Sequence, residues 1–174
     1  MTNDTNKTEA SRNTEASRKT RYQVTVGDQS AALKTLQYDD INVGDDVVPY
    51  TRWLTKQSAI RFGRTYKDAF SGHINPKVSE GQFGVRSMPV QGAVIEAGVT
   101  PMIINWLRSA KPWLYGGRQE TKFIQIAGPG NTLIYHGKVV EKTVEGERKY
   151  VWLDIHAENQ KGEKVMVGKA RVAF

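Results

Sequence analysis

One short stretch gathers residues that could do chemistry: FSGHINPKVSE, residues 70–80, which contains His73. The chain has 3 histidines and no cysteine, which excludes thiol nucleophiles, cysteine-ligated zinc and cysteine-held iron–sulfur clusters. An imidazole exchanges protons near neutral pH, so His73 is a candidate general base or acid. The alternative, equally open at this point, is that His73 is a bystander in a loop.

Two neighbouring side chains could assist such a group. Asn75 precedes Pro76, so it is first of all a turn former, although its amide could also hold a water molecule. Glu96 falls inside an apolar segment, where a carboxylate needs a polar or charged partner. We therefore consider Glu96 either as a displaced acid or as a residue at the seam between two subunits.

The remaining histidines, His136 and His156, fall in segments with the alternating pattern of strands, and we interpret them as sheet-surface residues. The three histidines lie far apart in the sequence and no two have ligand spacing, so no metal site is expected. GPGN at 128–131 is interpreted as a turn rather than a phosphate-binding loop. No cofactor is expected.

Size and charge limit the function classes. With 174 residues and 19.5 kDa, one domain is expected. The net charge of +7 favours an anionic small molecule, such as a nucleotide-bearing thioester. The basic residues form no long run, so a nucleic-acid partner is not expected. No apolar run approaches the roughly 18–20 residues of a membrane span and the N-terminus lacks a secretory signal, so we expect a cytoplasmic protein without membrane association.

The first part of the chain is of low complexity. Residues 1–21 are rich in Thr, Asn, Ser, Lys and Arg, and the segment TEASR occurs at both 8–12 and 14–18. Such a composition cannot bury enough apolar surface to offset the entropy lost on ordering. We predict a disordered tail over 1–36, in which YQVTVG (22–27) could add a short strand, and one folded domain over 37–174.

Helical periodicity marks two segments. In residues 55–70 aromatic and apolar residues recur every three or four positions, which predicts a helix capped by Thr55 or Ser58 and ended by the SGHINP sequence. Residues 88–112 form the longest apolar periodic segment. They predict one long buried helix with a kink at Pro101.

Strand patterns lie on both sides of these helices. Residues 46–53 read as an entry strand, and after residue 118 the period changes to two. A strand at 121–128 and three more, with hairpin turns at 144–148 and 159–163, predict a four-stranded antiparallel meander. Helices followed by strands indicate an α+β fold, with the sheet wrapped around the long helix.

The loop that contains His73 resembles the MaoC-like (R)-specific enoyl-CoA hydratases. Their pattern is approximately S-G-D-x-N-P-x-H-x-D, followed by P-[IV]-A-H-G-M at the start of the central helix. Matches to these two blocks are Ser71, Gly72, Asn75, Pro76 and Gly92. The C-terminal sequence NQKGEKVMVGKARVAF is similar to the family's closing hairpin. The resemblance covers about residues 38–174 and implies a single hotdog fold.

The departures from this pattern fall on the reactive groups. The family's Asp and His are replaced by His73 and Val78, and the His of the second block is replaced by Gln91. Pro89 is present, one residue nearer to Gly92 than in the pattern. The resemblance implies two groups of site residues. The catalytic candidates are His73, Asn75 and Gly92, and the substrate-binding candidates are Gln91, Pro89, Val78 and Glu96.

What the resemblance implies for chemistry is the hydration of an enoyl thioester. The backbone N–H of Gly92 would polarise the thioester carbonyl at the start of a helix, where negative charge is favoured. His73 could take the proton of water, whereas Val78 can neither orient it nor carry a second proton. Asn75 could hold that water.

Three functions remain open. The first is a hydratase or dehydratase acting on an enoyl-CoA or on a 3-hydroxyacyl-CoA or acyl-carrier-protein thioester, with altered acid/base residues. The second is a catalytically inactive subunit that binds an acyl thioester or supports an active partner. The third is a diverged enzyme such as a thioesterase, in which Glu96 or Glu80 would act. Because hotdog domains associate in pairs, the resemblance implies a homodimer or a heterodimer with another hotdog subunit.

Overall fold

The computed structural model describes residues 34–67 and 71–174, and its compact unit spans Lys34–Phe174. The backbone N–H of Leu36 donates to the carbonyl of Leu107 at 3.1 Å, and the Leu36 side chain packs against the core. Residues 34–36, expected in the tail, therefore belong to the domain, because they find both a hydrogen bond and an apolar contact there. The rest of the expected tail lies outside the described residues.

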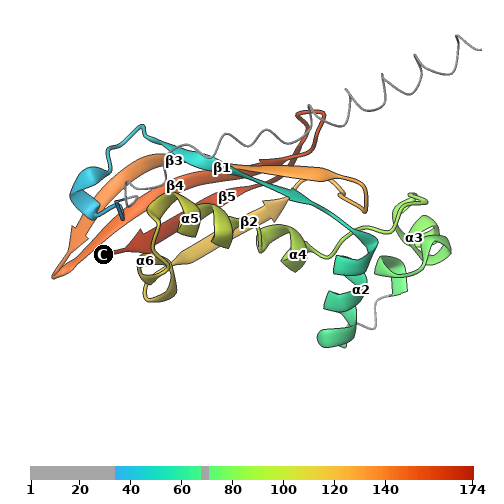
Figure 1. The fold of residues 1–174 in the computed structure, drawn as a ribbon. Coiled ribbons are helices and arrows are strands. Elements are labelled where there is room, and N and C mark those ends of the chain that lie inside the picture. The colour runs from blue at the N-terminus through green and yellow to red at the C-terminus, as the bar shows by residue number, and fades with distance from the viewer. Residues whose placement is uncertain (1–33, 68–70) are drawn as a thin grey trace, which may run out of the picture. The chain divides into compact units, whose positions relative to one another are not determined.

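Five antiparallel strands form one sheet in the order β1-β3-β4-β5-β2 (Figure 1). They are β1 (Asp46–Trp53), β2 (Arg118–Phe123), β3 (Thr132–Glu145), β4 (Arg148–Glu158) and β5 (Lys164–Ala173). The entry strand is confirmed, and so are the two hairpin turns, where Gly146 and Gly162 adopt the positive φ angles that favour glycine. Among the described strands, β1 and β2 are the two edge strands.

The expected four-stranded meander is wrong in one respect. The strand predicted at 121–128 is found at Arg118–Phe123 and pairs with β5, not with β3. The segment after it leaves the ladder because its backbone bonds elsewhere: Val90 N–H donates to the carbonyl of Ala127 at 2.8 Å, and Gly130 N–H donates to that of Leu54 at 2.9 Å. These bonds lead the chain from the β2 edge of the sheet to the β1 edge.

Seven helical elements accompany the sheet in the described part of the chain. They are η1 (Tyr38–Asp40), α2 (Lys56–Thr65), η2 (Ser71–His73), α3 (Pro76–Phe83), α4 (Gly92–Glu96), α5 (Val99–Leu107) and α6 (Lys111–Leu114). Thr55 caps α2, accepting a bond from Ser58 N–H at 3.0 Å, as one of the two predictions had it. The predicted helix ends earlier, at Thr65. The short helix α3 was not predicted; Asn75 caps it and Pro76 occupies its first turn, where no N–H is needed.

The long central helix is interrupted at Ala97–Gly98, between α4 and α5, and not at the predicted Pro101. The hydroxyl of Tyr135 donates to the carbonyl of Ile95 at 2.6 Å, and a Cβ on Gly98 would lie 2.1 Å from the Tyr135 ring. A side chain inserted against the helical ladder is a recognised cause of a kink. Pro101 then falls in the first turn of α5, where its missing N–H costs no bond.

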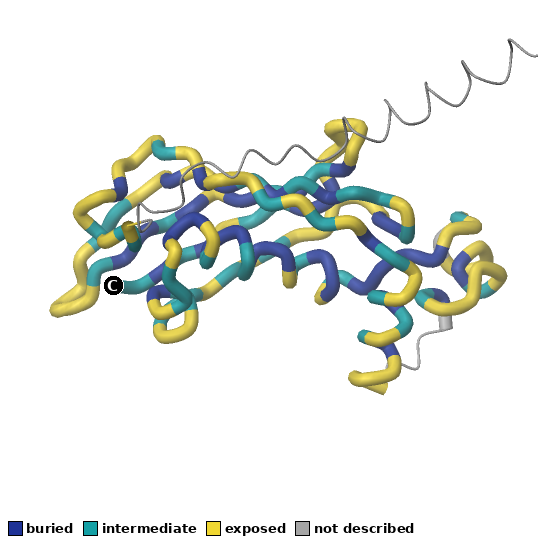
Figure 2. Tube along the Cα trace, in the orientation of Figure 1, coloured by how far each residue is buried: buried dark blue, intermediate teal, exposed yellow. Residues whose placement is uncertain are grey.

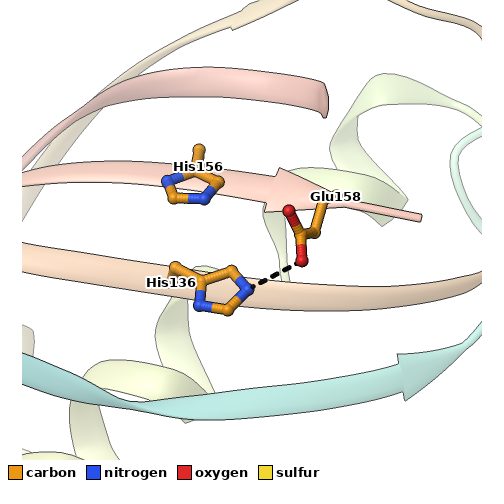
Figure 3. A group of neighbouring side chains, drawn as sticks. All are labelled: His136, His156 and Glu158. Atoms are coloured by element: carbon orange, nitrogen blue, oxygen red, sulfur yellow. Dashed lines mark ion pairs between the residues drawn. The ribbon is translucent and has the colours of Figure 1, made fainter. Parts of the chain in front are cut away.

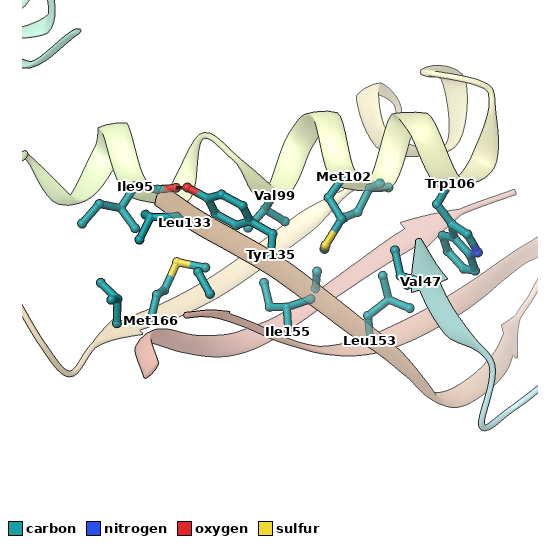
Figure 4. Packing of buried hydrophobic residues seen from close by; sticks show 14 of the residues in the cluster. Val47, Ile95, Val99, Met102, Trp106, Leu133, Tyr135, Leu153, Ile155 and Met166 are labelled. Atoms are coloured by element: carbon teal, nitrogen blue, oxygen red, sulfur yellow. Dashed lines mark hydrogen bonds between the residues drawn. The ribbon is translucent and has the colours of Figure 1, made fainter. Parts of the chain in front are cut away.

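The core lies between α5 and the inner face of the sheet (Figure 4). α5 turns one face inward at helical spacing through Val99, Met102, Ile103, Trp106 and Leu107. Burying each such side chain contributes about 1.5–3 kcal/mol. In Figure 2 the buried trace follows the central helices and the middle strands, while the hairpin ends are exposed. The α+β class and the sheet around a central helix are confirmed.

On β4, four residues that alternate along one face are all buried: Val151, Leu153, Ile155 and Ala157. Among the residues that the structure describes, no helix combines the length and the apolar character that a membrane span requires.

Candidate functional site

The imidazole of His73 is held against the backbone that leads into α4. Its Nδ1 lies 2.7 Å from the carbonyl oxygen of Pro89. A carbonyl only accepts hydrogen bonds, so Nδ1 donates, and in the neutral ring Nε2 is the nitrogen that carries the lone pair. The half-buried position of His73 and this bond together fix both its tautomer and its orientation. The structure therefore brings two of the sequence candidates into direct contact.

The segment from Pro89 to Gly92 forms the other wall of this region. Pro89 is buried, and Gln91 is only 5% exposed at the position that precedes α4. The side-chain amide of Gln91 donates to the carbonyl of Ala59 in α2 at 3.3 Å. Gln91 thus ties the start of α4 to α2.

Gly92, the first residue of α4, lies against a side chain of another element. A Cβ at this position would lie 2.6 Å from the ring of Phe123, which comes from the edge strand β2. The first N–H groups of a helix have no acceptor within it, and they form its positive end. Phe123 is therefore a site neighbour that the sequence analysis missed; its only signal there was the alternation of an ordinary strand.

Three other candidates are engaged in different contacts. Asn75 is exposed, and its Oδ1 accepts a bond from Lys77 N–H at 3.0 Å as the cap of α3. Val78 is half-buried on α3. The carboxylate of Glu96 accepts a bond from the Thr121 hydroxyl at 3.0 Å, so it is tied to β2. His73 thus contacts Pro89, whereas Asn75 caps α3 and Glu96 binds Thr121.

A groove of about 590 Å³ lies beside the start of α4. It is lined by Arg52, Ser58, Arg61, Phe62, Thr65, Tyr66, Ala93, Val94 and Ala97. The rings of Phe62 and Tyr66 stack with their centroids 4.5 Å apart, and the guanidinium of Arg52 donates to the carbonyl of Val94 at 2.8 Å. The groove therefore combines an apolar wall with two cationic groups.

His136 and His156 do lie on the outer face of the sheet, as interpreted from the sequence. Although the two lie far apart in the sequence, the ladder pairs His136 directly with His156. With Glu158 they form the one group of possible metal ligands among the described residues. Burial, followed by the neighbouring His136 and Lys164, lowers the pKa of His156, while Glu158 acts in the opposite direction.

Comparison with known proteins gives likeness in structure only. No protein-family model matches the chain, and no curated protein matches it either. Among solved structures, the R-hydratase PhaJ1 from Pseudomonas aeruginosa is 22% identical with a TM-score of 0.62, over 78% of this chain and 83% of that one. The MaoC-like dehydratase from Rhodospirillum rubrum is 20% identical with a TM-score of 0.64, over 78% of this chain and 93% of that one.

A third neighbour is a complex of different subunits. The HadBC (3R-hydroxyacyl-ACP dehydratase) complex from Mycobacterium tuberculosis is 13% identical with a TM-score of 0.64, over 76% of this chain and 96% of that one. At these identities the likeness establishes the fold, which is the hotdog fold that the sequence resemblance implied.

Proposed function

We propose that this chain, which shares its fold with MaoC-like dehydratases and (R)-hydratases, adds water to or removes water from acyl thioesters, with His73 as the acid/base group. The observation that carries the proposal is the 2.7 Å contact between His73 Nδ1 and the carbonyl of Pro89. This contact orients the imidazole and selects its tautomer beside the start of the central helix. General acid–base catalysis needs a positioned imidazole of this kind.

In the hydration direction, Nε2 of His73 takes one proton from water as the oxygen attacks Cβ of the enoyl thioester. The bond electrons move toward the thioester oxygen, and the imidazolium then returns the proton to Cα, so that one water molecule is added in total. Dehydration is the reverse. The bond to Pro89 stabilises the imidazolium, because the carbonyl oxygen faces its Nδ1–H.

The developing negative charge on the thioester oxygen needs a donor. The N–H of Gly92 is suited to this role, because it lies at the positive end of α4 and bears no side chain. Phe123 lies against Gly92 and would shield the reacting atoms from water. A preorganised backbone donor of this type is worth about 10²–10³ in rate.

The groove beside α4 suits the rest of the substrate. The stacked Phe62 and Tyr66 offer an apolar surface for an acyl or pantetheine chain, and Arg52 and Arg61 offer positive charge for a phosphorylated carrier. The net charge of +7 acts in the same direction. These features fit coenzyme A and an acyl-carrier protein alike.

A second candidate function is that of a supporting subunit. The observation that favours it is the apolar edge at the end of β2, where Phe123, Ile124 and Ile126 are 41%, 49% and 45% exposed. An unpaired edge strand with exposed apolar side chains is suited to contact with another chain. The HadBC neighbour is itself a complex of two different subunits.

The test uses the purified full chain with crotonyl-CoA and longer 2-enoyl-CoAs, followed through the loss of enoyl absorbance. We expect hydration by the wild type and a fall in kcat of about 10²–10⁴ for His73→Gln, with KM little changed. Gln82→Ala, an exposed residue of α3, is the control and keeps the activity.

Each other outcome has a meaning. Full activity in His73→Gln would rule out the imidazole as the acid/base group. Activity that appears only with a co-expressed hotdog homologue would favour the supporting subunit. Release of free coenzyme A in place of hydration would favour a thioesterase.

A further inference from the structure

Three side chains with metal-binding chemistry meet on the outer face of the sheet (Figure 3). His136 on β3 pairs directly with His156 on β4, and Glu158 follows two residues further on the same face of β4. The two imidazole rings stack, with centroids 4.8 Å apart and an angle of 17° between their planes. Two imidazoles and one carboxylate are a donor set that zinc prefers.

The possible ligand atoms of the three residues lie near one another. One ligand atom from each residue can be chosen such that all lie within 4.8 Å of one another. Nε2 of His136 lies 3.3 Å from Oε1 of Glu158. In a tetrahedral zinc site with bonds of about 2.0–2.1 Å, two ligand atoms are about 3.3 Å apart. This pair therefore already has the spacing that a shared ion requires.

The contact between His136 and Glu158 is not a satisfied hydrogen bond. Nε2 of His136 is shielded from solvent, and within the described part of the chain it has no hydrogen-bond partner of proper geometry, although the Glu158 carboxylate is near. A polar atom that is shielded from solvent and lacks a hydrogen-bond partner destabilises the folded state. A cation between the ring nitrogen and the carboxylate would remove that cost.

A β-bulge creates the group. The register of β3 and β4 shifts between Val139 and Glu141, so Val140 is an extra residue on β3. If the pairing of Glu145 with Arg148 continued without this shift, His136 would face Ala157 and not His156. A shift of one residue also moves a side chain to the other face of the sheet.

The surroundings are open and balanced in charge. A groove of about 500 Å³ reaches both histidines. Acidic and basic residues alternate around it: Asp46, Asp154 and Glu158 against Lys138, Lys164 and Lys169. The ammonium of Lys138 lies 3.6 Å from the carboxylate of Asp46, so these two charges offset each other. The carboxylate of Glu158 could then offset part of the charge of a bound ion.

We propose that His136, His156 and Glu158 bind one Zn²⁺ ion, or a similar divalent transition-metal cation, on the outer face of the sheet, with water completing the coordination. The zinc site does not depend on the proposed function at His73. Its residues lie on the outer face of the sheet, whereas the core packs against the inner face.

The experiment is a titration of the metal-free full chain with zinc chloride by calorimetry, alone and in variants. We expect one zinc per chain in the wild type. His136→Gln and His156→Gln should abolish zinc binding, and Glu158→Gln should weaken zinc affinity by at least about 10-fold. Substituting a residue that only hydrogen-bonds to a metal ligand already causes a loss of that size. His73→Gln removes the remaining histidine and should keep the binding. Circular dichroism of each zinc-free variant checks that it is folded.

The wild type gives a second readout that needs no variant. X-ray absorption at the zinc edge should show two imidazole nitrogens at about 2.0–2.1 Å together with oxygen ligands. The proposal would be overturned by unchanged zinc binding in both His136→Gln and His156→Gln, or by a coordination shell with no imidazole. Absence of zinc binding at millimolar concentration would overturn it as well.

Discussion

The hydroxyl of Tyr135 donates a hydrogen bond to the backbone carbonyl of Ile95 at 2.6 Å, and this bond joins β3 to the end of α4. Tyr135 is fully buried, and its ring occupies the space that a side chain on Gly98 would need. The kink between α4 and α5 thus depends on one contact between residues 40 positions apart. Because Gly92 lies at the other end of α4, the same contact helps to orient the candidate site.

Removing that hydroxyl should weaken the fold. We expect Tyr135→Phe to lower the free energy of unfolding by about 1–3 kcal/mol, because the buried Ile95 carbonyl loses a donor while the ring remains. Urea denaturation measures the change. Tyr115→Phe is the matched control, since Tyr115 is 81% exposed and should change stability little. Equal stability of Tyr135→Phe and wild type would contradict the importance of this bond.

The same tyrosine predicts a dependence on alkaline pH. Burial raises the pKa of Tyr135 to about 12. The unfolded chain releases this proton near pH 10, so the stabilisation is complete below pH 10 and is lost as the pH rises through about 12. The stability advantage of wild type over Tyr135→Phe should therefore shrink by about 1 kcal/mol between pH 9 and pH 11. Urea midpoints at several pH values test this, and a constant difference would speak against it.

Two glycines in the central helices should respond differently to alanine. A Cβ on Gly98 meets the Tyr135 ring at 2.1 Å, and that ring is buried and hydrogen-bonded. A Cβ on Gly92 meets Phe123 at 2.6 Å, but Phe123 is 41% exposed and can turn away. We expect Gly98→Ala to cost about 1–3 kcal/mol and Gly92→Ala less than about 1 kcal/mol, since alanine also favours the helix. Urea unfolding of the pair decides; equal losses would show that Phe123 is as fixed as Tyr135.

The edge of β2 should carry the contact with a second chain. We expect Ile124→Lys to weaken self-association at least about 10-fold, because a charge replaces a 49%-exposed apolar side chain where an interface would form. Sedimentation velocity over a range of concentrations measures it. Val144→Lys, at the far end of β3, is the control: Val144 is 60% exposed but remote from this edge. If only Val144→Lys dissociates the protein, the interface lies elsewhere.

Local sequence signals were enough for much of this structure. The alternation in 148–158 identifies the buried face of β4 because successive residues of a strand point to opposite sides. Thr55 could be named as a helix cap because its side chain satisfies an N–H only three residues away. Residue types alone identified His73, within SGHINP, as a candidate site residue.

Features that depend on residues far apart in the sequence could not be predicted from local sequence signals. The sequence did not indicate that β2 pairs with β5, since the bonds that carry the following segment across the sheet join Ala127 to Val90 and Gly130 to Leu54. Nor did it indicate the kink at Gly98, between α4 and α5, which we attribute to the contact with Tyr135 on β3.

The histidines of the sheet make the same distinction. The sequence by itself determined that His136 and His156 lie on strands joined by a hairpin, whereas it did not indicate the short helix η2 that contains His73. Only the tertiary structure decided that the first two face each other and that His73 faces the carbonyl of Pro89. The physical reason is that periodicity fixes which side of an element a residue occupies, whereas bulges and long-range hydrogen bonds fix what it meets there.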